Sequence, residues 1–93
     1  MFDLLVEFIG TFFFLTVILA TGEAVPIGLA LLTAIYFGGK ISGGHFNPAV
    51  STMMAIKGAI SLEKFIGYIV AQVLGGVVAL MFWNAATRKS LKK

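Results

Sequence analysis

Apolar residues gather in three long segments along this chain, separated by short polar stretches. The first segment covers residues 4–21 and the longest covers residues 62–83. Each can cross a hydrocarbon layer of about 30 Å as a helix rising ~1.5 Å per residue, with flanking side chains reaching the interface. The segment 25–37 is short for a full crossing, and Gly38-Gly39 is expected to end it. The pattern predicts an all-α membrane protein with three transmembrane helices.

The most polar stretch inside this apolar sequence lies between the second and third segments. Residues 42–50 read Ser-Gly-Gly-His-Phe-Asn-Pro-Ala-Val. Asn47 suits the cap of a helix, and Pro48 suits its first position. A helix over residues 48–56 would be about 14 Å long, roughly half of the hydrocarbon thickness. The stretch therefore predicts a re-entrant loop and half-helix, with the positive helix end near the bilayer centre.

The composition agrees with a membrane protein and leaves little chemistry for other functions. Hydrophobic residues make up 59% of the chain, charged residues 12%, and the mean hydropathy is +1.02. There is no cysteine and only one histidine, so neither a thiolate nor a histidine metal site is expected. No set of nucleophile, base and orienting group can be assembled either. We expect no enzymatic activity, no metal and no cofactor.

The basic residues are concentrated near the end of the sequence. We expect one membrane domain over residues 1–83 and a basic soluble tail over residues 84–93. Four of the seven basic residues lie in that tail: Arg88, Lys89, Lys92 and Lys93. A basic segment after an apolar helix is typical of a membrane anchor facing anionic lipid. The expected partner is therefore membrane lipid and not nucleic acid.

Small residues recur every fourth position in the last apolar segment. They are Gly67, Ala71, Gly75 and Ala79. Such a stripe lets another helix approach closely. Packing within the chain is the favoured explanation, and association with a separate chain is the alternative.

The polar stretch resembles the Asn-Pro-Ala loop in the first repeat of the aquaporins and glycerol facilitators. The resemblance lies in residues 41–50 and extends to Glu-Phe-Ile-Gly-Thr at 7–11 and Tyr-Ile-Val-Ala-Gln at 68–72. These segments follow the order and spacing of the family and cover almost the whole chain. The resemblance implies one half of an inverted-repeat fold and a passive channel subunit.

The resemblance also implies roles for two polar residues inside the predicted spans. Glu7 and Gln72 would bond the non-helical backbone of residues 40–45. A carboxyl inside a membrane span is costly and needs a partner or water. The alternative for Glu7 is a hydrated position one turn inside the interface. The alternative for Gln72 is an ordinary hydrogen bond between helices, worth ~1 kcal/mol or less.

The motif Asn47, Pro48 and Ala49 would stand at the pore. The Asn47 amide and the helix N-terminus would orient a water or polyol oxygen, oppose cations and interrupt a proton-conducting water chain. A plain helix cap is the alternative for Asn47. His45 would either bond loop carbonyls or line the pore, and a pH-dependent gate is the less favoured possibility.

The constriction implied by superposing this repeat on both family repeats is apolar. Its positions fall on Ile27, Ile35, Gly44 and Val50. Val50 stands where the second repeat of water channels has an arginine. This lining favours small neutral solutes such as polyols, urea, ammonia or gases, with water not excluded.

Family members carry two such repeats in opposite orientations, and 93 residues have room for one. Three lysines, Lys40, Lys57 and Lys64, would lie on one side of the membrane and the four tail residues on the other. This bias is too small to fix the orientation. Two copies inserted in opposite senses would rebuild the inverted repeat, so an antiparallel homodimer is expected, either alone or within a larger assembly. The alternatives are a half channel that needs a separate second-repeat chain, and a non-conducting structural membrane protein.

Overall fold

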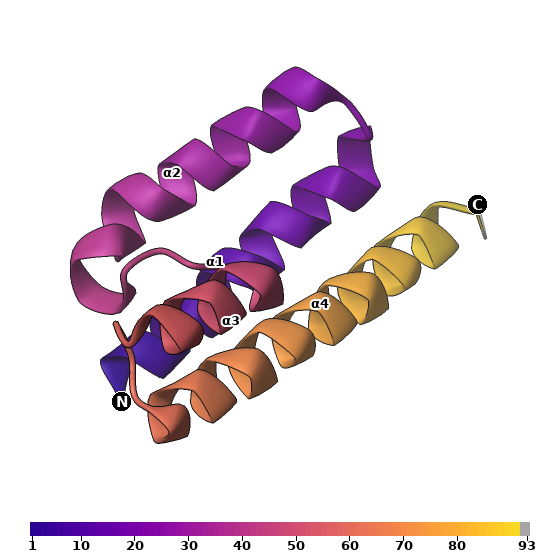
Figure 1. Ribbon diagram of the computed structural model, residues 1–93. Coiled ribbons are helices and arrows are strands. Elements are labelled where there is room, and N and C mark those ends of the chain that lie inside the picture. Colours follow the sequence, from indigo (N-terminus) through magenta and orange to yellow (C-terminus); the bar gives the residue numbers. More distant parts are fainter. Residues whose placement is uncertain (92–93) are drawn as a thin grey trace.

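The computed structural model describes residues 1–91, which form four helices (Figure 1). They are α1 (Phe2–Thr21), α2 (Ala24–Ser42), α3 (Pro48–Lys57) and α4 (Leu62–Leu91). Three segments are long and apolar enough to cross a membrane: Phe2–Thr21, Ala24–Ser42 and Leu62–Arg88. The prediction of three transmembrane helices and one half-length helix is confirmed.

The start of α3 follows the capping pattern of its sequence. Asn47 has extended backbone, and its Oδ1 accepts a hydrogen bond of 2.8 Å from the Ala49 N–H. Pro48 occupies the first helical position, where the missing N–H costs nothing. The helix ends at Gly58, whose φ of 85° is readily available only to glycine. The predicted boundaries of the half-helix are therefore correct to within one residue.

Helix α2 is longer than predicted, because Gly38-Gly39 does not end it. The helix continues to Ser42 and ends at Gly43, with a φ of 90°. Gly38 is buried, and a Cβ there would lie 2.7 Å from Cγ1 of Val6 on α1. The glycine thus allows α1 and α2 to approach closely. This contact offsets the ~1 kcal/mol by which glycine is less favourable than alanine inside a helix. The non-helical loop covers residues 43–47 and does not begin at residue 40 as expected.

Helix α4 also extends beyond its predicted end at Trp83. It reaches Leu91, because residues 84–91 contain neither glycine nor proline. The first eight residues of the expected tail are therefore helical. Residues 92 and 93 lie outside the described part, and the soluble character of the tail stays a prediction.

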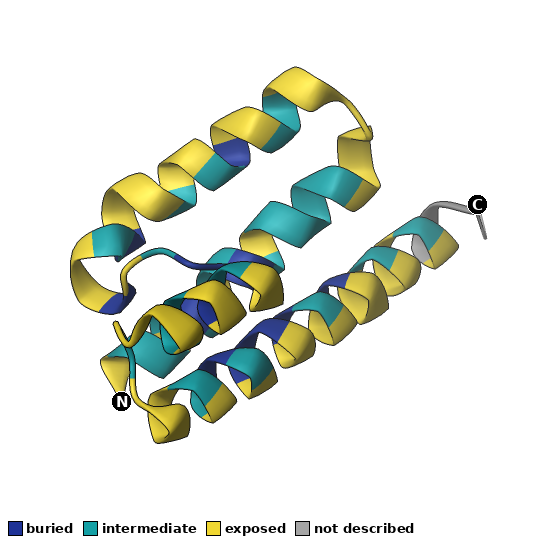
Figure 2. Ribbon diagram, in the orientation of Figure 1, coloured by how far each residue is buried: buried dark blue, intermediate teal, exposed yellow. Residues whose placement is uncertain are grey.

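Helix α1 packs against both α2 and α4, and α3 packs against α4. The small-residue stripe of α4 faces α1 (Figure 2). A Cβ at Gly67 would lie 2.9 Å from Cδ2 of Leu4, and one at Gly75 would lie 2.9 Å from the carbonyl oxygen of Phe8. Packing of the stripe within the chain is confirmed.

The helix order places the predicted basic clusters at opposite ends of the bundle. The starts of α1 and α4 and the ends of α2 and α3 lie at one end, opposite the last turns of α4 (Figure 1). Lys40, Lys57 and Lys64 belong to that end, and Arg88 belongs to the other. Lys64 also pairs with Asp3 at an Nζ–Oδ2 distance of 3.2 Å, which joins the starts of α1 and α4.

Candidate functional site

The site is built around the carboxylate of Glu7, which is fully buried on α1. Its Oε1 accepts hydrogen bonds from the backbone N–H of Phe46 at 2.7 Å and from Nε2 of Gln72 at 2.9 Å. Its Oε2 accepts from the Ser42 hydroxyl at 2.7 Å and from the backbone N–H of His45 at 3.0 Å. Four donors satisfy the buried carboxylate. Glu7 therefore holds the non-helical loop against α1.

Gln72 reaches the loop indirectly, which differs from the sequence-based expectation. Its Nε2 donates to Glu7 Oε1 and to the Ser51 hydroxyl oxygen, both at 2.9 Å, and not to the loop backbone. Gln72 lies where α4 packs against α1 and α3. Gln72 thus connects the carboxylate on α1 to the half-helix.

His45 is buried, and its ring is held on two sides. Nδ1 lies 2.8 Å from the Ser51 hydroxyl oxygen, and the ring meets Tyr68 edge to face at 5.0 Å between centroids. The Ser51 hydroxyl also accepts from Nε2 of Gln72, so it links His45 to Gln72. The ring thus bonds a hydroxyl of the half-helix and not the loop carbonyls expected from the sequence, and pore lining stays a prediction.

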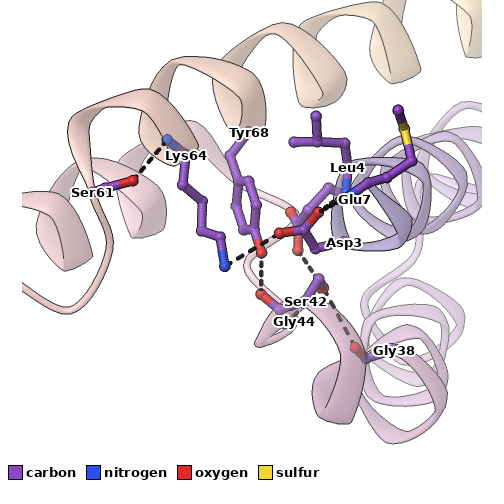
Figure 3. Close-up of polar contacts among 10 residues, drawn as sticks. Asp3, Leu4, Glu7, Gly38, Ser42, Gly44, Ser61, Lys64 and Tyr68 are labelled. Atoms are coloured by element: carbon purple, nitrogen blue, oxygen red, sulfur yellow. Dashed lines mark hydrogen bonds and ion pairs between the residues drawn. The ribbon is translucent and has the colours of Figure 1, made fainter.

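Sequence reasoning did not assign Ser42, Ser51 or Tyr68 to the site. The Tyr68 hydroxyl donates to the Ser42 carbonyl at 2.6 Å, and the Ser42 hydroxyl oxygen accepts from the Gly44 N–H at 3.1 Å (Figure 3). Tyr68 lies one helical turn before Gln72, so the spacing of these two residues already indicates a shared face. Ser42 and Ser51 carry no comparable spacing pattern.

Asn47 is exposed at the start of α3, next to a groove of about 480 Å³. Because its Oδ1 is bonded to Ala49, the two hydrogens of its amide nitrogen remain for another partner. Asn47 and Pro48 line this groove, which we call the Asn47 groove, together with residues of α1 and with Gln72, Val73, Gly76, Val77 and Leu80 of α4. These α4 residues lie in the middle of the span Leu62–Arg88. The amide therefore stands near mid-span.

The four expected constriction residues are only partly brought together. A Cβ at Gly44 would lie 3.4 Å from Cγ1 of Ile35, so these two positions are adjacent. Ile27 lies eight residues before Ile35 on α2, about 12 Å away along the helix axis at ~1.5 Å per residue. Val50 belongs to the first turn of α3 and is half-buried. Ala49, beside it, is exposed.

Comparison with known proteins shows the family of this chain. The family model described as Major intrinsic protein matches residues 21–93. The chain is 49% identical over 84 residues to "Glycerol uptake facilitator protein-like 6" of Lactiplantibacillus plantarum, covering 81% of this chain and 39% of that protein. It is 50% identical over 58 residues to "Aquaporin Z" of Brucella melitensis biotype 1, covering 62% of this chain and 25% of that protein.

No solved structure matches the chain. The chain spans well under half the length of both curated relatives. The match nevertheless covers most of its residues, and three of its helices have the length and hydropathy of membrane spans. This chain belongs to the major intrinsic protein family, whose members are integral membrane channels.

Proposed function

We propose that this chain forms one half of a pore for small neutral solutes and acts as a channel subunit, not as an enzyme. The observation that carries the proposal is the exposed Asn47 amide at the N-terminus of α3, beside a groove at mid-span. Its two amide hydrogens and the positive end of the half-helix orient the oxygen of a passing solute. The same arrangement opposes cations and interrupts a chain of proton-conducting waters.

The solutes we propose are water, glycerol-like polyols, urea, ammonia and gases. The expected constriction at Ile27, Ile35, Gly44 and Val50 carries no charged side chain. Such a lining admits neutral molecules and disfavours ions, which would lose hydration without compensation. One relative is named "Glycerol uptake facilitator protein-like 6", which supports glycerol as the first solute to test.

The other half of the pore comes from a second copy inserted in the opposite sense. Helix α3 has ten residues and α4 has 30, so α3 can cover only part of the length of α4. The Asn47 groove continues beyond the N-terminus of α3 along α1 and α4. A second half-helix of opposite direction fits that place, and its Asn47 would meet the first at mid-span. A separate chain carrying a second repeat is the alternative occupant.

The test is solute-driven swelling of vesicles that contain the protein. Asn47→Ser keeps a good helix cap but removes the amide hydrogens, so glycerol flux should fall to the level of protein-free vesicles. The matched control is Asn84→Ala, an exposed asparagine on α4, which should keep the parental flux. Parental flux in Asn47→Ser would contradict the proposal. Absence of flux in the parent would favour either a half channel that needs a separate second-repeat chain or a non-conducting structural protein.

A further inference from the structure

Phe46 has an unusual backbone conformation for a large side chain. Its φ is 52°, and it is the sole non-glycine residue with positive φ in the described range 1–91. L-residues avoid this left-handed region because Cβ crowds the following carbonyl. Such a conformation persists only where the surroundings enforce it. The neighbours of Phe46 therefore determine how the loop is held.

The ring of Phe46 is seated in a notch formed by Gly10 on α1 and Gly38 on α2. A Cβ on Gly10 would overlap the ring and lie 2.7 Å from its Cδ1. A Cβ on Gly38 would lie 3.1 Å from its Cζ. The side chain is 2% exposed. The Gly10–Gly38 notch thus accepts the ring only because both positions lack a side chain.

The backbone of Phe46 is held by a hydrogen bond. Its N–H donates to Glu7 at 2.7 Å, and the next residue, Asn47, is extended with φ −162° and ψ 124°. Phe46 is also the one residue that lines both the Asn47 groove and a second groove, of about 390 Å³, between α1 and α2. Phe46 therefore lies between the two grooves, next to Asn47 in the sequence.

We propose that Phe46 is a positioning residue for the pore: its ring, seated in the Gly10–Gly38 notch, fixes where the Asn47 amide stands. This inference rests on the proposed function, since it assigns Asn47 to solute passage. Asn47 follows Phe46 directly, and consecutive Cα atoms are about 3.8 Å apart across a trans peptide. A shift of the ring in the notch moves the Phe46 backbone and carries Asn47 with it. The role is to place the amide, and Phe46 itself need not touch the solute.

The experiment combines variants of the ring and of its notch. Gly10→Ala should displace the ring, reduce glycerol flux and shift the side-chain amide NMR signal of isotope-labelled Asn47 in detergent. Gly10→Ala with Phe46→Leu should restore part of both, because leucine lacks the outer ring atoms. The matched control is Gly28→Ala on α2, where a Cβ meets nothing within 4 Å. It should leave flux and signal at parental values.

Phe46→Ala gives the same test without touching a helix glycine. It should lose most of the glycerol flux and split or broaden the Asn47 amide signal, while Phe46→Leu keeps one signal. A folded Phe46→Ala protein with parental flux and an unchanged signal would overturn the inference. If Gly10→Ala does not fold, the Phe46→Ala and Phe46→Leu pair decides alone. If Asn47→Ser keeps parental flux, the proposed function fails, and the amide signal by itself still decides whether Phe46 positions Asn47.

Discussion

Glu7 accounts for much of the order in the loop before α3. It accepts hydrogen bonds from two backbone N–H groups of that loop, from one side-chain amide and from one hydroxyl. Backbone groups in a membrane span must find partners inside the protein, because lipid offers none. This one carboxylate therefore satisfies two backbone N–H groups of the loop 43–47, those of His45 and Phe46. Its charge is useful because charged acceptors form stronger hydrogen bonds.

Replacement of Glu7 by leucine should destabilise the fold by several kcal/mol, since each buried N–H without a partner costs about 1–3 kcal/mol. Glu7→Gln should be milder, because the amide oxygen can still accept from the loop. The free energy of unfolding in detergent is the measurement. Glu63→Leu, at an exposed site on α4, is the control and should change little. Equal stability of Glu7→Leu and the parent would show that the loop does not depend on this carboxylate.

At the scale of helices, glycine has two different structural roles in this chain. Gly22, Gly43 and Gly58 end helices with positive φ. Gly38 and Gly75 lie inside helices, where they permit close contact with α1. Sequence alone cannot separate the two uses, because the choice depends on which helix packs alongside. For this reason the end of α2 was predicted too early. The start at Pro48 was predicted correctly from its cap, and the start at Leu62 from the apolar pattern.

The close contact at Gly75 predicts a clear difference between two glycine substitutions. Gly75→Ala puts a Cβ 2.9 Å from the Phe8 carbonyl oxygen and 3.2 Å from the Phe12 nitrogen, both backbone atoms that cannot move aside easily. Overpacking of this kind costs about 1–3 kcal/mol. Gly28→Ala, which meets open space, should be neutral or slightly stabilising. Thermal unfolding in detergent checks the order. A Gly75→Ala protein as stable as Gly28→Ala would contradict the tight packing of α1 on α4.

The sequence predicted those residues of the candidate site whose type is unusual inside a membrane span or typical of a helix cap. A carboxylate and an amide inside apolar spans indicated Glu7 and Gln72, and the Asn-Pro pair indicated the cap of α3. The hydroxyls of Ser42 and Ser51 and the strained conformation of Phe46 gave no such indication. Serine and phenylalanine occur in membrane helices for many reasons. Their roles emerge only when α1, α2 and α4 surround the loop.

As a whole, the molecule has a small buried centre and a largely apolar exterior. Most large apolar residues of α2 and α4 are exposed, and many of those on α1 are half-buried (Figure 2). In lipid this exterior is solvated, so it needs no further cover. The Asn47 groove differs, because it places the exposed polar Asn47 among apolar walls at mid-span. That groove is where a second half-helix would complete the pore.

Replacement of basic residues at either end of the bundle should control the orientation of the chain in the membrane. Lys40 and Lys57 are exposed at one end, and their replacement by glutamine spares the ion pair between Lys64 and Asp3. This variant keeps one lysine against the four basic residues of the tail, which should fix the C-terminus in the cytoplasm. Glutamine at Lys89, Lys92 and Lys93 should bias the chain the other way. Accessibility of a C-terminal tag verifies each orientation.

The most direct measurement is glycerol-driven swelling of vesicles that hold these two variants, singly and mixed. If two oppositely oriented copies form the pore, each variant alone should swell at the rate of protein-free vesicles. The mixture should recover the flux of the parent. Parental flux from one variant whose orientation is shown to be uniform would contradict the antiparallel pore.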